Sequence, residues 1–183
     1  MSKPVPDLMT NRLKLSTFKE TDIPSIVSLA NNYAVAKNLG RMPFPYLVKD
    51  AEFFLDKIVT TELTWKISLL DTSEMIGTIG LRPIVKDEVS ELGFWYGQEF
   101  WGNGYATEAA KAVIDLAFKE LALSKIEAGH FLVNEASGNV LKKVGFTQTG
   151  TSLRDCMAQN KKLSHAELEL KSINFVSPPA HSK

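Results

Sequence analysis

The sequence predicts a mixed α/β fold, with a mostly antiparallel sheet of about seven strands flanked by about four helices, and three observations predict it. Residues 65–96 hold three short apolar runs separated by polar turns, the pattern of an antiparallel meander. Residues 105–121 then carry the apolar stripe of an amphipathic helix. Another apolar run, residues 125–133, follows that helix. A strand–helix–strand unit favours a parallel pair, so the sheet should be mixed.

The N-terminal third is expected to supply one strand and two helices before the meander. Residues 12–17 alternate apolar and polar side chains, as a half-buried strand does. Asp22 precedes Pro24, the usual order of an N-cap and a first-turn proline, so a helix should begin there. Residues 40–46 hold two prolines and a glycine and should form a loop. An apolar side over residues 49–61 predicts the second helix.

The remaining elements follow from the same two periodicities. Alternation and apolar runs predict strands over residues 65–70, 75–81, 89–96, 125–133, 146–153 and 167–175. Helical spacing predicts helices over residues 105–121 and 135–144, and Gly145 is a suitable residue to close the second. The last residues, 177–183, contain two prolines and should form a loose tail, so one domain is expected to span residues 1–176.

Composition and charge exclude several classes of protein. The chain has 183 residues, of which 44% are hydrophobic and 23% charged, as in an ordinary globular domain. Basic and acidic residues number 21 each, so no nucleic-acid partner is expected for so balanced a surface. No run approaches the roughly 20 apolar residues of a membrane helix, and residues 1–12 lack the apolar core typical of a signal peptide. With Cys156 as the one cysteine, we expect a cytoplasmic protein that binds no membrane.

The most informative segment is the glycine-rich turn before the long helix, Trp101-Gly102-Asn103-Gly104-Tyr105-Ala106-Thr107. Glycine lets the backbone approach a ligand closely, and the first N–H groups of a helix attract anions. The turn can therefore hold a pyrophosphate without a lysine. It is not a P-loop, because no Gly-Lys-Ser or Gly-Lys-Thr follows. Taken alone, such a turn is more often a tightly packed helix start than a phosphate site.

A second segment lies downstream, where a strand ends and a helix begins. It contains Asn134 and Ser137, followed by the run Val140-Leu141-Lys142-Lys143-Val144-Gly145-Phe146. Each of the two polar residues is explained equally well as a helix cap.

Together the two segments resemble the GNAT superfamily of acyl-CoA-dependent N-acyltransferases. The resemblance is closest to its RimJ/RimL-type branch, the N-terminal acetyltransferases of ribosomal proteins. That branch carries Trp-Gly-x-Gly-Tyr-Ala-x-Glu-Ala, matched over residues 101–109, and Asn-x-x-Ser leading to Leu-x-Lys-x-Gly-Phe, matched over residues 134–146. Residues 11–15 and 91–96 also match, so the resemblance spans most of the chain. It implies a GNAT fold with a splayed sheet.

The resemblance implies acetyl-CoA as a cosubstrate and names the residues that hold it. The pyrophosphate is expected on the backbone of residues 101–107. The pantetheine arm should lie along Phe94-Trp95-Tyr96 like an added strand, with Asn134 hydrogen-bonded to it. No metal is implied, and the sequence has no Cys/His cluster with metal-ligand spacing.

Transfer requires a neutral amine, and two residues are candidates for moving protons. Glu91 is the candidate general base, acting through water, on an otherwise apolar strand where burial would make its carboxylate a stronger base. A surface charge near a strand end explains Glu91 as well. The tyrosine that many GNAT enzymes use as an acid is replaced by Leu141, so Ser137 is the substitute candidate.

The acceptor is expected to be a protein or peptide N-terminal α-amine, or a small amine derived from an amino acid. By resemblance, residues 21–61 and 152–166 form its groove. Roughly a tenth of an α-amine is neutral at pH 7, against about one in a thousand of a lysine-type amine. The alternative is a catalytically weak acyl-CoA-binding sensor or scaffold, which Leu141 favours. The chain is expected to be a monomer or a homodimer.

Overall fold

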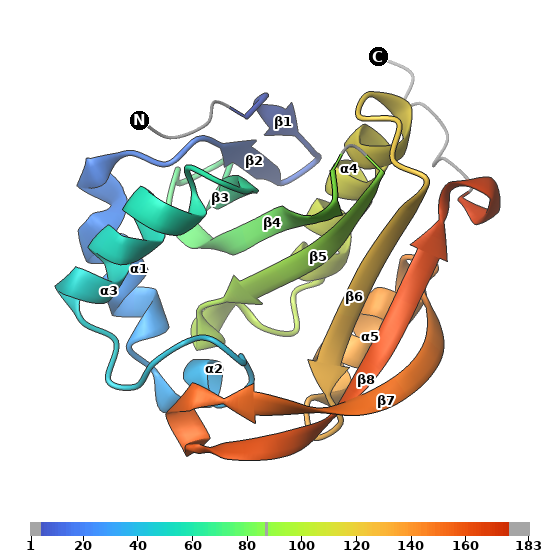
Figure 1. Cartoon of the computed structure of the whole chain (residues 1–183). Coiled ribbons are helices and arrows are strands. Elements are labelled where there is room, and N and C mark those ends of the chain that lie inside the picture. Colours follow the sequence, from blue (N-terminus) through green and yellow to red (C-terminus); the bar gives the residue numbers. More distant parts are fainter. Residues whose placement is uncertain (1–4, 87, 176–183) are drawn as a thin grey trace.

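The computed structural model describes residues 5–86 and 88–175, and one sheet of eight strands forms the centre of this part (Figure 1). The strands are β1 (Leu8–Met9), β2 (Leu13–Ser16), β3 (Leu63–Leu69), β4 (Met75–Val85), β5 (Val89–Tyr96), β6 (Lys125–Phe131), β7 (Thr147–Cys156) and β8 (Lys161–Lys171). Their order in the sheet is β1-β2-β3-β4-β5-β6-β8-β7. Neighbours are antiparallel except β5 and β6, so the predicted mixed, mostly antiparallel sheet is confirmed.

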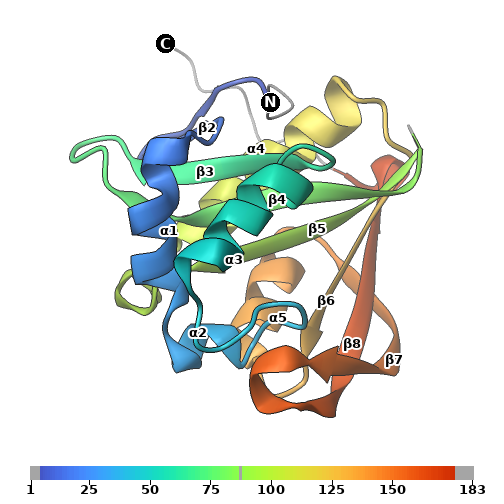
Figure 2. The same ribbon diagram turned by 60° about the vertical axis from the view of Figure 1, so that its left-hand side comes forward.

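Helices cover both faces of this sheet. They are α1 (Ile23–Ala30), α2 (Tyr33–Ala36), α3 (Val48–Phe53), α4 (Tyr105–Lys119) and α5 (Glu135–Lys143). Figure 2 shows α1 and α3 on one face, in front of β3, β4 and β5, with α4 on the opposite face. The same views place α2 beside the turn between β7 and β8 (Figures 1 and 2). Helix α2 and the turn of the last hairpin therefore lie side by side.

Three local differences from the predictions have physical causes. The two-residue strand β1 is too short to show a periodic pattern. The Asn32 side chain accepts a hydrogen bond from the N–H of Ala34 at 2.8 Å, so a new helix starts where the first was expected to continue. Strand β8 begins at Lys161 rather than at Glu167, because the chain reverses tightly at Asn160, where φ is 48°. The predicted tail, residues 177–183, lies outside the described residues.

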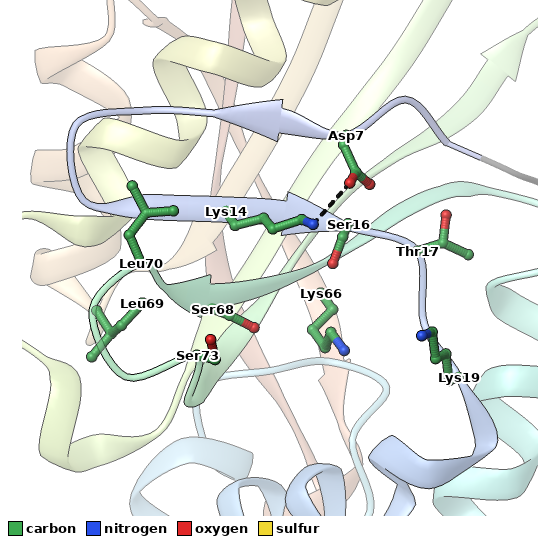
Figure 3. A pocket seen from close by; sticks show the side chains of 10 residues that line it. All are labelled: Asp7, Lys14, Ser16, Thr17, Lys19, Lys66, Ser68, Leu69, Leu70 and Ser73. Atoms are coloured by element: carbon green, nitrogen blue, oxygen red, sulfur yellow. Dashed lines mark ion pairs between the residues drawn. The ribbon is translucent and has the colours of Figure 1, made fainter.

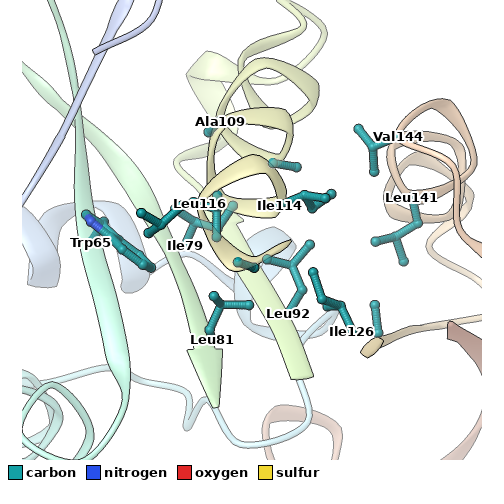
Figure 4. Close-up of a cluster of buried hydrophobic side chains, with 14 of the residues drawn as sticks. Trp65, Ile79, Leu81, Leu92, Ala109, Ile114, Leu116, Ile126, Leu141 and Val144 are labelled. Carbon is teal, nitrogen blue, oxygen red and sulfur yellow. The ribbon is translucent and has the colours of Figure 1, made fainter. Parts of the chain in front are cut away.

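Two apolar layers join the helices to the sheet. The layer under α4 and α5 contains Trp65, Ile114 and Leu141, none more than 1% exposed (Figure 4). The layer under α1–α3 contains Ile26 and Val59, which are equally buried. Full burial of an apolar side chain contributes roughly 1.5–3 kcal/mol. The two layers therefore hold the end of β5 and the start of α4 in fixed positions.

The parallel pair β5–β6 is short, and it opens into a gap. Residues 89–91 pair with residues 125–127, and beyond them the two strands diverge (Figure 1). On the other side of β5, the N–H of Gly97 donates to the carbonyl of Ile76 on β4 at 3.0 Å. By the alternation of an antiparallel ladder, the backbone N–H and C=O of Phe94 then point away from β4. The V-gap, our name for the space between residues 92–96 and residues 128–131, thus exposes an unpaired strand edge inside the sheet.

Candidate active site

Two glycines with left-handed backbone shape the turn between β5 and α4. Gly102 has a φ of 78° and Gly104 a φ of 79°, a region that costs other residues roughly 1–2 kcal/mol. Among the described residues, a Cβ on Gly102 would meet no atom within 4 Å. One on Gly104 would meet Arg12 Nη2 at 3.6 Å and nothing nearer. The space above the turn is therefore open to a ligand.

The first N–H groups of α4 face this open space without partners. The N–H of Glu108 is the first to be bonded, to the carbonyl of Gly104 at 3.1 Å. In the described part of the chain, the N–H groups of Tyr105, Ala106 and Thr107 have no acceptor. The helix dipole adds partial positive charge at this end. Such an arrangement binds phosphate oxygens.

Arg12, at the entry to β2, holds the turn to α4. Its Nη1 donates to the carbonyl of Asn103 at 3.0 Å, while its Nε and Nη2 each lie 2.7 Å from Glu108 Oε2. The guanidinium also lies 4.6 Å from the centre of the Tyr105 ring, a cation–π contact. Thr10 Oγ1 donates to the same carboxylate at 2.6 Å. Sequence reasoning missed these roles because the partners are far apart in the chain.

The aromatic end of β5 offers its backbone to the V-gap, while its side chains pack elsewhere. Tyr96 lies in the core, and burial raises the pKa of its hydroxyl. Trp95 packs against the layer under α1–α3, and Phe94 against the layer under α4 and α5. Trp101 Nε1 donates to the carbonyl of Tyr96 at 2.9 Å. This bond fastens the glycine turn to the end of the strand.

The start of α5 lies at the end of β6, on the other side of the V-gap. Asn134 Oδ1 accepts from the N–H of Ser137 at 3.3 Å, so the capping interpretation of Asn134 is confirmed. The amide nitrogen of Asn134 and the hydroxyl of Ser137 have no partner among residues 5–86 and 88–175. Both groups remain available to a ligand. Leu141 is 1% exposed and belongs to the core.

Glu91 lies at the closed end of the V-gap, as the last residue of β5 that still pairs with β6. Its side chain is 32% exposed and forms an ion pair with Arg82 of β4. The burial expected for this carboxylate is therefore partial, and a guanidinium neutralises its charge. A cavity of about 210 Å³ adjoins the pair. Its other charged lining residues are Glu127, Arg154 and Glu167.

The face beside Glu91 is open. Gly93 shares that face, because side chains alternate along a strand. A Cβ on Gly93 would meet none of the described residues within 4 Å. A small group can therefore approach the edge of β5 from the side on which Glu91 lies.

A second cavity, of about 500 Å³, lies away from the turn, on the outer strands β2 and β3 (Figure 3). Lysine and serine side chains line much of it, among them Lys14, Ser16, Lys66 and Ser68. Lys14 pairs with Asp7 at 3.0 Å, and Lys66 pairs with Asp22 at 2.8 Å. None of the residues that line this cavity belongs to the glycine turn or the V-gap.

Comparison with known proteins identifies the family. Residues 12–147 match the acetyltransferase (GNAT) domain. The chain belongs to the GNAT acetyltransferase family. It is 33% identical over 163 residues to the uncharacterized N-acetyltransferase YoaA of Bacillus subtilis (strain 168), covering 85% of this chain and 90% of YoaA. This GNAT protein is accordingly an acyltransferase, as the sequence predicted.

Solved GNAT structures share its fold. A ribosomal-protein-S5-alanine acetyltransferase from Vibrio fischeri superposes with a TM-score of 0.75, at 18% identity, over 94% of this chain and 100% of that one. A spermidine N-acetyltransferase from Vibrio cholerae, solved with CoA and spermine, gives 0.76 at 19% identity, over 88% of this chain and 96% of that one. The predicted GNAT fold is confirmed. One fold thus serves a protein acceptor and a polyamine, so the fold does not select the acceptor.

The helices of this GNAT chain fall short of a membrane span. Within residues 5–86 and 88–175, none is long and apolar enough to cross a membrane.

Proposed function

We propose that this GNAT enzyme transfers an acetyl group from acetyl-CoA to a primary amine, by direct attack of the amine on the thioester. The observation that carries the proposal is the row of unpartnered N–H groups at Tyr105, Ala106 and Thr107, next to the unpaired edge of β5. A phosphate site beside a strand edge suits a ligand with a pyrophosphate and an extended arm that contains amides. Acetyl-CoA has both.

The residues of the turn and the V-gap fit this cosubstrate. Residues 101–107 would hold the pyrophosphate through backbone N–H groups. The backbone of residues 94–96 and the free amide of Asn134 would hold the pantetheine arm. When bound, acetyl-CoA supplies the activated acetyl group. No metal is part of the proposal.

Glu91 and Ser137 are the proposed proton-handling residues. Glu91 would take a proton from the amine through a water molecule, since it lies on the open face beside Gly93. The Ser137 hydroxyl would donate a hydrogen bond to the departing thiolate, which is already a fair leaving group at a thiol pKa near 8.5.

Replacing Glu91 with glutamine is expected to lower kcat about 100-fold, because a general base contributes at least that much. The amide keeps the size of the side chain and can still hydrogen-bond Arg82. Thiol release at saturating acetyl-CoA measures the effect. Glu169→Gln is the matched control, because Glu169 also lies in an ion-paired strand position, contacting Lys125 and Lys171. Wild-type kcat in Glu91→Gln would remove Glu91 from the mechanism.

The proposed acceptor is a protein or peptide α-amine, or a small amine derived from an amino acid. The low pKa of α-amines supports it, because little base strength is then needed. The RimJ/RimL-like motifs and the fold shared with a ribosomal-protein acetyltransferase support the protein acceptor. We further propose one domain over residues 1–176, a cytoplasmic location, a monomer or homodimer, and no nucleic-acid partner.

Calorimetry with acetyl-CoA, followed by thiol release against a panel of peptides and amines, tests the function. We expect binding and turnover, with α-amines ahead of alkylamines at pH 7. Binding without turnover on any amine would favour the alternative, an acyl-CoA-binding sensor or scaffold. No binding would overturn the proposal, because every proposed role depends on this cosubstrate.

A further inference from the structure

A histidine of β8 lies at the mouth of the V-gap, on the face that carries Glu91. His165 is paired with Phe131 of β6, and Glu167 with Gly129. Gly129 belongs to the part of β6 that has diverged from β5. A Cβ on Gly129 would lie 2.1 Å from His165 Cε1 and 2.8 Å from its Nε2, so the imidazole rests directly on this glycine.

The same face of the sheet carries Glu91 and His165. Glu127 and Gly129 are two residues apart on β6, so they share a face. Glu127 and Glu167 line one cavity with Glu91, which places all three on that face. The imidazole of His165 lies over Gly129, two residues along β6 from Glu127, and so on the same face.

Packing and hydrogen bonding fix the ring in one orientation. The Phe131 ring meets it edge-on, with centroids 5.6 Å apart. His165 Nδ1 lies 3.3 Å from Glu167 Oε1. That carboxylate also accepts from the Ser152 hydroxyl, and from Arg154 Nη2 at 3.0 Å. A carboxylate at Nδ1 favours the tautomer with the proton there, which leaves the lone pair on Nε2.

Nε2 is free to accept a proton. Among the described residues it has no hydrogen-bond partner. Burial lowers the pKa of His165, and Arg154 of β7 and His130 of β6 lower it further, while Glu167 on its own strand opposes them. The ring is therefore neutral at pH 7, the form that a general base requires.

We propose that His165 is a catalytic base for acetyl transfer and that Glu167 is its positioning residue, an inference that rests on the proposed function. The amine nitrogen forms a bond to the thioester carbonyl carbon, and the carbon–sulfur bond breaks with its electron pair on sulfur. One proton of the amine passes to His165 Nε2 and then to solvent. The thiolate takes up a proton, so the products are the amide and CoA thiol. The ammonium form of the acceptor sheds two protons in all: Glu91 takes the first through water, which gives the neutral amine that attacks, and His165 takes the second.

Profiles of kcat/KM against pH, measured with one amine throughout, test the assignment. We expect His165→Gln to lower kcat/KM about 100-fold at pH 7.5. It should also remove an ionisation that lies below the usual histidine pKa in the wild type. Glu167→Gln should keep this ionisation but move it to lower pH, because the carboxylate that raises the pKa of His165 is gone. Imidazole should partly restore the activity of His165→Ala.

Controls separate this inference from the proposed function. Calorimetry with acetyl-CoA should give wild-type affinity for every variant. His130→Gln should retain the ionisation, because that ring packs on Gly138 of α5 instead. A wild type that does not bind acetyl-CoA would overturn the proposed function itself.

Two results would overturn the role of His165 alone. One is a His165→Gln enzyme that binds acetyl-CoA and keeps the wild-type rate and ionisation. The other is a Glu167→Gln profile with the ionisation unmoved, which decides the matter even if the His165 variants do not fold.

Discussion

Acetyl-CoA should bind Gly104→Val about 100-fold more weakly than the wild type, a loss of about 2.7 kcal/mol. A β-branched side chain disfavours the φ of 79° that Gly104 adopts, so the backbone must leave that conformation. The N–H groups of Tyr105, Ala106 and Thr107 follow directly and would turn away from the phosphate oxygens. Calorimetry measures the loss.

A glycine outside the turn provides the control. A Cβ on Gly150 of β7 would meet none of the described residues within 4 Å, and the φ of Gly150 is not positive. Gly150→Val should therefore keep the affinity for acetyl-CoA. Gly104→Asn should lose less than Gly104→Val, because asparagine tolerates left-handed backbone. If Gly104→Val bound like the wild type, the turn would not be the phosphate site.

Glu108→Ala should lower the free energy of unfolding by about 2–4 kcal/mol at pH 7, because charged hydrogen bonds are lost from a largely buried carboxylate. Its partners are the Thr10 hydroxyl at 2.6 Å, the Arg12 N–H at 2.9 Å and the Arg12 guanidinium at 2.7 Å. Urea unfolding measures the change. Asp7→Ala removes an exposed ion pair with Lys14 and should cost less than about 1 kcal/mol.

The same carboxylate gives the stability a pH dependence. Burial would raise the pKa of Glu108, but hydrogen bonds from Thr10 and Arg12 outweigh it and lower the pKa. A lowered carboxyl pKa means that the stabilisation is complete above the pKa of the unfolded chain. It is lost as pH falls through the lower pKa of the folded protein. The difference between wild type and Glu108→Ala should therefore shrink in acid, and a constant difference would contradict this assignment.

Local patterns predicted the fold well, because strands and helices differ in their apolar periods. The position of the glycine turn could also be predicted, since Gly102 and Gly104 precede a clearly amphipathic helix. The ion pair between Arg12 and Glu108 could not be predicted, because only the folded sheet brings the two residues together. Arg82 was missed as the partner of Glu91 for the same reason, although the two residues are neighbours across β4 and β5.

His165 was missed for a local reason. The last strand was expected to begin at Glu167, which left His165 in a loop with no defined face. Because β8 begins at Lys161, alternation along the strand puts the side chains of His165 and Glu167, two residues apart, on one face. The signal was the alternation of the apolar residues Ala166, Leu168 and Leu170 with polar residues between them. The same alternation places His165, just before Ala166, on the polar side of the strand.

The V-gap has a consequence for how the protein avoids wrong contacts. An unpaired strand edge can template pairing with any extended chain, so proteins usually shield their edge strands with charges, prolines or bulges. β5 carries its free edge in the interior of the sheet, held open by divergence from β6 after only three residue pairs. The arm of acetyl-CoA, lying along this edge, would occupy its free hydrogen-bonding groups. The bound cosubstrate would thereby also hinder aggregation through this edge.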